Sequence, residues 1–133
     1  MQAKNYERIP QSVEDVGRAV LNAAFKVHTA LGPGLLESVY QTCTAYEITQ
    51  GGLLAPTEVT LPVVYKDVKL DAGLRLDMLV NDCVIVEFKA VEELHPIHTA
   101  QVISYLKISG LRLGYLINFN VRRLKEGIKR IAV

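Results

Sequence analysis

Residues 74–89, which read LRLDMLVNDCVIVEFK, decide the fold of this chain. The two halves of the stretch, 74–80 and 83–89, are short and rich in aliphatic side chains, and the turn-prone pair Asn81-Asp82 separates them. Apolar runs of this length between turn residues predict two core strands joined by a tight hairpin. Charged side chains nevertheless fall within both strands, where a charge is costly unless it is paired or binds a cation.

The charged groups that matter most are Asp77 on the first predicted strand and Glu87 and Lys89 on the second. Glu87 and Lys89 are two residues apart, so their side chains leave the same face of a strand. A two-residue hairpin loop would turn Asp77 to the opposite face from Glu87, whereas a three-residue loop of 81–83, or a bulge, would place the two acids opposite each other. Because Asn and Asp tolerate the left-handed conformation of the longer loop, we expect that loop or a bulge.

Two facing carboxylates repel each other, and both stay ionised only with a cation between them. Carboxylate oxygens suit Mg²⁺ or Mn²⁺, with other coordination positions left for water and a phosphate. Lys89 would then lie near that phosphate, where it could orient or deprotonate the attacking water or stabilise the developing charge. Two alternatives stay open: a buried ion pair of an acid with Lys89 and no chemistry, and a salt bridge of Asp77 with Arg75 on the same strand face.

The composition is that of a folded protein with one ordinary core. The chain has 133 residues and is 50% hydrophobic, so we expect one domain over residues 1–133, with residues 1–11 loosely ordered. No apolar run is long enough for a membrane span, and the N-terminal residues lack a signal-peptide core. Cys43 and Cys83 do not have the spacing of a metal site or a disulfide framework, so a cytoplasmic location is expected.

The net charge of +1 conceals an uneven distribution. The first 106 residues carry eight basic and thirteen acidic side chains, a balance of −5, whereas residues 107–133 carry seven basic and one acidic, a balance of +6. A basic end beside an acidic site would suit a metal-dependent enzyme that acts on a polyanion. A solvated helix or strand face would explain the same charges.

Helix and strand signals alternate along the chain. Ser12, followed by acids, predicts a helix start, and Pro62 predicts an edge or bulged strand. The predicted helices are 12–31, 35–50 and 97–109; the predicted strands are 57–65, 68–70, 74–80, 83–89 and 114–119, followed by a short turn or helix and a last strand at 128–133. This order predicts an α/β protein with a mixed sheet and helices on its faces, in which helix 97–109 crosses over between parallel strands.

One further motif connects these elements to a known family. Residues 34–40 read GLLESVY, which has the pattern G-x-x-E-x-x-Y. Further along the chain, in order, stand Asp77, Glu87, Lys89, Gln101 and Tyr105. With these residues the chain resembles the GxxExxY proteins of the PD-(D/E)XK nuclease-like superfamily, and the likeness covers nearly the whole chain.

The resemblance implies a restriction-endonuclease-like α/β fold, a mixed sheet flanked by helices. It implies that Asp77 and Glu87 hold Mg²⁺ or Mn²⁺, with Glu37 as a third metal-binding acid, and that Lys89 assists the water. Gln101 and Tyr105, four apart on a helix and so on one face, are similar to the Q-x-x-x-Y extension that positions phosphate or metal-bound water. The candidate catalytic residues are therefore Glu37, Asp77, Glu87, Lys89, Gln101 and Tyr105.

The function that follows from the resemblance is metal-dependent hydrolysis of phosphodiester bonds in DNA or RNA. The chain has no obvious specificity domain, and a fold does not by itself establish an activity. The alternatives are a non-catalytic scaffold that binds nucleic acid or protein and retains the nuclease fold, and a phosphoesterase acting on small nucleotides. By analogy with nucleases that cut two strands with two copies, a homodimer is a further expectation.

Overall fold

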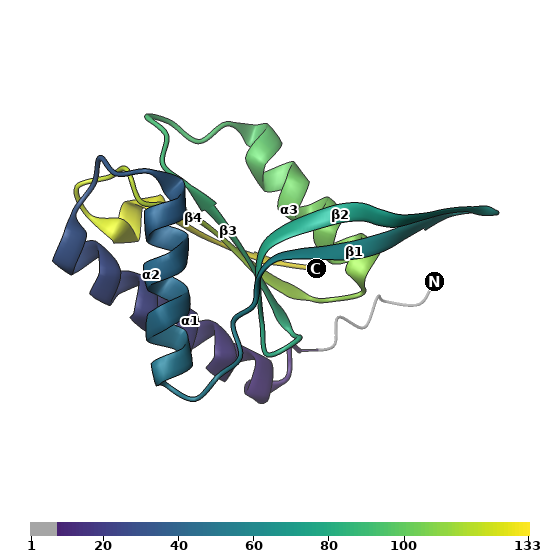
Figure 1. The fold of residues 1–133 in the computed structure, drawn as a ribbon, viewed down its shortest axis with the longest axis horizontal. Helices are drawn as coiled ribbons and strands as arrows, with labels where there is room; N and C mark the ends of the chain where they lie inside the picture. The colour runs from purple at the N-terminus through teal and green to yellow at the C-terminus, as the bar shows by residue number, and fades with distance from the viewer. Residues whose placement is uncertain (1–7) are drawn as a thin grey trace, which may run out of the picture.

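A computed structural model describes residues 8–133. Figure 1 shows a mixed sheet with α1 and α2 on one side and α3 on the other. The elements of the described chain, in order, are α1 (Gln11–Leu31), α2 (Glu37–Gln50), β1 (Thr57–Tyr65), β2 (Val68–Val80), β3 (Val84–Lys89), α3 (Pro96–Ser109), β4 (Leu113–Asn118), the 3₁₀ helix η1 (Leu124–Gly127) and β5 (Ile128–Ala132). The predicted α/β class with a flanked mixed sheet is confirmed.

The sheet has five strands in the order β1-β2-β3-β4-β5. Only β3 and β4 run parallel, and α3 joins them as the predicted crossover. Both strands are buried almost throughout because helices cover both faces of the sheet. Apolar side chains of α1 and α2 pack with one set of strand residues, and Val102 and Leu106 of α3 pack with another. The centre of the sheet is therefore fixed from two sides.

The hairpin between β2 and β3 has the predicted three-residue loop. Val80 pairs with Val84, which leaves residues 81–83 as the loop. Asn81 and Asp82 adopt the left-handed conformation, with φ of 50° and 56°. These two residue types accept that conformation more readily than others, so the local sequence sets the register of the whole hairpin.

The strand β2 corrects one prediction. Segments 68–70 and 74–80 were expected as separate strands, but they form one strand, β2. Gly73 does not end the strand: a Cβ at this glycine would lie 2.7 Å from Cβ of Val63 on β1, so its missing side chain makes room for the neighbouring strand. The register shifts between Leu61 and Val63, at Pro62, which confirms the predicted irregular edge strand.

The start of α1 corrects a second prediction. The helix begins at Gln11 after Pro10, and no side chain caps it, so Ser12 is not the N-cap. Proline suits the beginning of a helix for two reasons. Its fixed φ is compatible with the helix start, and the backbone N–H that it lacks would have no acceptor within the helix there. The prediction of loose order for residues 1–11 falls mainly on residues 1–7, which lie outside the described part of the chain; Ile9 already packs against the core.

Candidate active site

The two acids of the hairpin lie together where β2 and β3 separate. Ladder pairing of these strands ends at Met78↔Val86. One residue beyond, the backbone N–H of Asp77 donates to Glu87 Oε1 at 3.0 Å, and the backbone N–H of Phe88 donates to Asp77 Oδ2 at 2.9 Å. Each carboxyl group thus takes the place of a main-chain acceptor on the opposite strand. The predicted convergence of Asp77 and Glu87 is confirmed.

This position makes ionisation of Glu87 costly. The side chain is 4% exposed, and burial is the main cause that raises the pKa of its carboxyl to about 8. The negative charge of Asp77 and a hydrogen bond to the Asp77 carboxyl raise the pKa further, while the hydrogen bond from the Asp77 backbone N–H and the charge of Lys89 lower it. Near neutral pH, and without a cation, the raised pKa favours the protonated form of Glu87. A divalent cation would relieve the same repulsion.

Glu37 enters from the first turn of α2, and the turn before it is held by Tyr40. The Tyr40 hydroxyl donates to the Gly32 carbonyl at 2.6 Å and accepts from the Leu35 N–H at 3.1 Å. Its buried ring stacks on Phe119 with centroids 4.5 Å apart. Gly34 has φ of +98°, which glycine adopts without strain. In the motif of residues 34–40, glycine and tyrosine thus fix the turn that directs the glutamate.

Two residues of α3 complete the polar lining. Gln101 Nε2 donates to the Tyr105 hydroxyl at 2.7 Å, as their spacing of one helical turn allows. Burial, and then the charge of Glu87, raises the pKa of the Tyr105 hydroxyl. Tyr105 therefore stays protonated, and while it accepts from Gln101 its own O–H can donate to a phosphate oxygen or a water.

All six predicted residues line one cleft of about 390 Å³. The residues of the cleft wall are Glu37, Ser38, Gln41, Glu58, Arg75, Asp77, Glu87, Lys89, Gln101 and Tyr105. They come from α2, β1, β2, β3 and α3, so segments far apart in the sequence build it. The motif residues therefore share one surface hollow, as a common active site requires.

The salt bridge proposed for Asp77 is not formed. Arg75 pairs instead with Glu58, with Nη2 and Oε2 2.6 Å apart. Within residues 8–133 the only other ion pair joins Arg130 to Glu14, so Glu87 and Lys89 do not form one either. Within the described residues, Asp77 and Glu87 therefore form no ion pair with a basic side chain. A cation site needs this arrangement, whereas an ion-paired scaffold does not.

Glu58 and its neighbours are site residues that sequence reasoning missed. Glu58 has φ of +54°, a conformation that costs a non-glycine residue on the order of 1–3 kcal/mol. Gln41 donates to Glu58 at 3.2 Å, and the hydrogen bonds from Gln41 and Arg75 lower the pKa of its carboxyl. The position of Gln41, four residues after Glu37 on α2, was the one signal in the sequence; the backbone of Glu58 gave none.

Residues 14–131 match the family model described as the PD-(D/E)XK nuclease superfamily. The chain belongs to this superfamily. Comparison with curated proteins and with solved structures gives no match. The fold agrees with the superfamily, while the narrower GxxExxY family remains a prediction. Among the described helices, none combines the length and the apolar character needed to cross a membrane.

PD-(D/E)XK nucleases are typically metal-dependent, and the chemistry of the hairpin acids fits a hard cation. Asp77 and Glu87 offer carboxylate oxygens side by side, and these suit Mg²⁺ or Mn²⁺. Over residues 8–133, however, no group of three or more His, Cys, Asp or Glu side chains is arranged to hold a metal. Glu37 lines the cleft without forming such a group with the other two acids, so the expected three-acid set is not assembled.

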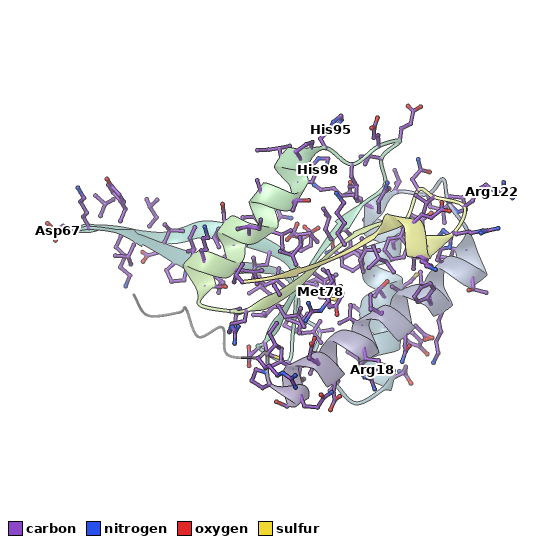
Figure 2. The ribbon with its side chains drawn as sticks, turned by 180° about the vertical axis from the view of Figure 1, so that it is seen from behind. Arg18, Asp67, Met78, His95, His98 and Arg122 are labelled. Atoms are coloured by element: carbon purple, nitrogen blue, oxygen red, sulfur yellow. The ribbon has the colours of Figure 1, made fainter. Side chains whose placement is uncertain are left out.

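The basic residues of the C-terminal part lie in different places on this nuclease fold. Arg130 is paired with Glu14, and Arg112 donates to the carbonyl of Val133. Arg122 and Arg123 are exposed on the loop after β4; Figure 2 labels Arg122 at the edge of the molecule. That loop leaves the sheet beside Lys89, because Lys89 pairs with the last residue of β4. The expected basic residues are therefore spread over a loop and a strand, and none of those after β4 lines the cleft.

Proposed function

We propose that this protein is a metal-dependent nuclease that hydrolyses phosphodiester bonds in nucleic acid, and that it is a GxxExxY protein within its superfamily. The observation that carries the proposal is the meeting of Asp77 and Glu87, one of them buried, with Lys89 in the same cleft. Packing alone gives no reason to place two mutually repelling acids there. A cation and a phosphate would supply the missing positive and negative partners.

In this proposal Asp77 and Glu87 hold Mg²⁺ or Mn²⁺. Glu37, which lines the same cleft from α2 but is not grouped with these two acids, would join them as the third acid only when the ion binds. The ion would supply charge neutralisation at the phosphate and a more acidic bound water. Lys89, two residues after Glu87 on β3, assists by orienting or deprotonating that water, or by stabilising charge on the phosphate oxygens. The N–H groups of Asp77 and Phe88 fix the hairpin carboxyls, so the ligands are oriented before substrate arrives.

Gln101 and Tyr105 would position the substrate from α3. Tyr105 accepts from Gln101 and still has its own proton to donate, because the pKa of its hydroxyl is raised. A phosphate oxygen in the cleft is an acceptor, and the Tyr105 O–H is a donor that needs no change of protonation. The helix carrying both residues is packed on the sheet through Val102 and Leu106, which keeps the pair at a fixed distance from the strands.

The rival scaffold hypothesis predicts ion pairs of Asp77 with Arg75 and of Glu87 with Lys89. Within the described residues neither pair is formed, and Arg75 binds Glu58 instead. This difference favours the nuclease. A phosphoesterase for small nucleotides would need no basic surface outside the cleft, and the exposed Arg122 and Arg123 on the loop beside β4 favour a longer polyanion.

The test is a calorimetric titration of Mg²⁺ and Mn²⁺ into the purified protein and its Asp77→Asn variant, in buffers of different ionisation enthalpy at pH 6, 7 and 8. Because Glu87 holds a proton below about pH 8, binding should release protons and tighten as the pH rises. Asp77→Asn should abolish the binding. The same proteins are then assayed for cleavage of labelled DNA and RNA. A wild-type protein that binds neither ion, even with a cleavage-resistant phosphorothioate oligonucleotide present, would leave the scaffold hypothesis standing.

A further inference from the structure

A second charged group in the cleft lies beside the proposed metal ligands. Arg75, two residues before Asp77 on β2, donates from Nε to Glu58 Oε2 at 2.7 Å, and its Nη2 lies 2.6 Å from the same oxygen. Glu58 in turn accepts from Gln41 of α2 at 3.2 Å. Three elements, α2, β1 and β2, thus hold one guanidinium group in the wall of the cleft.

The hydrogen bonds of Arg75 use one edge of its guanidinium group. Nε and one N–H of Nη2 face Glu58, so the other edge, formed by Nη1 and the second N–H of Nη2, remains directed away from Glu58. Two parallel N–H donors on that edge match two oxygens of a phosphate. The side chain of Arg75 is 66% exposed, so a ligand in the cleft can reach it.

A contribution to folding stability does not account for the ion pair of Arg75 with Glu58. Exposed ion pairs contribute little, because both side chains lose freedom and water screens the charges. Glu58 also holds a left-handed backbone conformation, which glutamate adopts with strain because it lacks the tolerance of glycine, Asn or Asp. Stability therefore gives no evident reason for this arrangement, and strain of this kind is concentrated at functional sites. Its benefit is a guanidinium group that is oriented before a ligand binds.

We propose that Arg75 binds the phosphate next to the scissile phosphate of a polynucleotide, and that Glu58, braced by Gln41, is its positioning residue. This inference rests on the proposed nuclease function. Two residues along a strand span about 6.6–6.8 Å, a distance comparable to that between neighbouring phosphates of one strand. A phosphate held between the hairpin acids and Lys89 would thus have its neighbour at Arg75. The substrate class is a chain of at least two phosphodiesters rather than a mononucleotide.

The test combines protein variants with substrates that lack one charge. A labelled DNA strand and an RNA strand of the same sequence are each prepared with a single neutral methylphosphonate at successive positions. Arg75→Ala should raise KM or Kd for the unmodified strand about 10- to 100-fold, the loss expected for a charge-assisted bidentate contact, with kcat changed less than about threefold. Arg75→Lys should be intermediate, since it keeps the charge without the fork.

The decisive result is the coupling between the variant and the substrate. A methylphosphonate next to the cleaved bond should weaken substrate binding by the wild-type protein as much as Arg75→Ala weakens binding of the unmodified strand. The same methylphosphonate should not weaken binding by Arg75→Ala any further. Glu58→Gln should reduce the coupling while Glu58→Asp restores part of it, which a purely structural role would not produce. Arg18→Ala on α1, a matched exposed arginine that lies outside the cleft, should change nothing (Figure 2).

The outcomes separate this inference from the function on which it rests. Suppose that the wild-type protein cleaves, and that the methylphosphonate weakens binding by Arg75→Ala as much as it weakens binding by the wild type. The proposed contact of Arg75 with the phosphate is then wrong, and the proposed nuclease function is retained. If the wild-type protein binds but never cleaves, and the coupling appears in Kd, the contact stands and the nuclease does not. A wild-type protein that neither binds nor cleaves either strand overturns both.

Discussion

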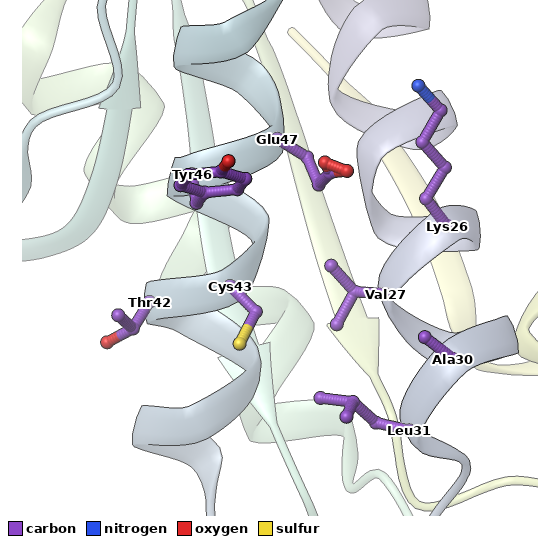
Figure 3. Close-up of a pocket in the computed structure, with 8 residues that line it drawn as sticks. All are labelled: Lys26, Val27, Ala30, Leu31, Thr42, Cys43, Tyr46 and Glu47. Atoms are coloured by element: carbon purple, nitrogen blue, oxygen red, sulfur yellow. The ribbon is translucent and has the colours of Figure 1, made fainter.

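Two hollows of nearly equal size lie on opposite sides of α2, and they differ in chemistry. The cleft of about 390 Å³ is lined by charged and polar groups, and α2 contributes Glu37, Ser38 and Gln41 to it. The groove between α1 and α2 measures about 400 Å³ and is almost entirely apolar. Figure 3 shows its lining residues: Lys26, Val27, Ala30 and Leu31 of α1, and Thr42, Cys43, Tyr46 and Glu47 of α2. Size therefore does not distinguish a functional site here.

The two hollows differ in how much they destabilise the folded chain. The groove lies between two packed helices, with small side chains such as Ala30 and Cys43 in its lining, and it buries no charge. The cleft holds Glu87 with a raised pKa beside Asp77, and it strains the backbone of Glu58. Costs that packing does not require are the better indicator of chemistry. Four changes test this contrast, and they should have progressively smaller effects.

Lys89→Ala should have the largest effect. Without the ammonium group near the phosphate, we expect cleavage to fall by about 10²–10³-fold or more, a loss typical of one electrostatic stabiliser or general base. The side chain lies at the end of β3 and is partly exposed, so the thermal midpoint should hardly move. Steady-state cleavage and a thermal melt measure the two quantities, and unaltered cleavage by a folded variant would rule out the role given to Lys89.

Glu87→Gln should have the next largest effect, on stability and with a defined pH dependence. In the metal-free protein the folded-state pKa of Glu87 is about 8, above its value in the unfolded chain, so the neutral carboxyl stabilises at low pH. That contribution is present below about pH 4.5 and is lost as the pH rises towards 8, on the order of a few kcal/mol. Glutamine, always neutral, should remove this loss.

The measurement is urea unfolding of both proteins between pH 5 and pH 9 in the presence of EDTA. The difference in free energy of unfolding, variant minus wild type, should rise with pH and level off above about pH 8. A difference that does not change with pH would mean that Glu87 ionises normally in the folded chain. The glutamine carbonyl can still accept the N–H of Asp77, so that hydrogen bond is retained.

Tyr40→Phe should cost less, about 1–2 kcal/mol. The ring would still stack on Phe119, but the Gly32 carbonyl and the Leu35 N–H would lose their partner in a part-buried turn. Because that turn directs Glu37, cleavage should fall slightly as well. Urea unfolding measures the first effect, and Tyr40→Leu, which also removes the stacking, should cost clearly more. Equal stability of Tyr40→Phe and wild type would show that the hydroxyl does not hold the turn.

The sequence was informative wherever a local rule decided the structure. The three-residue loop followed from the tolerance of Asn81 and Asp82 for left-handed φ, and the meeting of Asp77 with Glu87 followed from that loop. That Glu37 and the α3 residues share the cleft with the hairpin acids was expected from the resemblance to the superfamily. Strand alternation placed Lys89 on the face of Glu87, and helical spacing placed Gln101 on the face of Tyr105. These properties depend on neighbours along the chain, so one sequence sufficed to predict them.

What the sequence could not predict depends on contacts between distant segments. The continuity of β2 rests on Val63, which packs over Gly73 from β1. The partner of Arg75 is Glu58, which lies seventeen residues earlier and faces the arginine with a left-handed backbone. Neither hydrophobic periodicity nor motif spacing predicts a contact between such distant residues. The candidate motif could therefore be predicted from the sequence, whereas the residues that surround it could be identified only from the fold.

Tyr46→Ala in the apolar groove should have the smallest effect. The side chain is 61% exposed, alanine is a better helix former, and the hydrogen bond from Thr49 goes to the backbone carbonyl of Tyr46, which the variant keeps. The free energy of unfolding should stay within about 0.5 kcal/mol of the wild type, and cleavage should be unchanged. A loss of cleavage comparable to that of Tyr40→Phe would mean that α2 transmits changes from the groove to Glu37. The two hollows would then be one functional unit, and their contrast in chemistry would mark two parts of a single site.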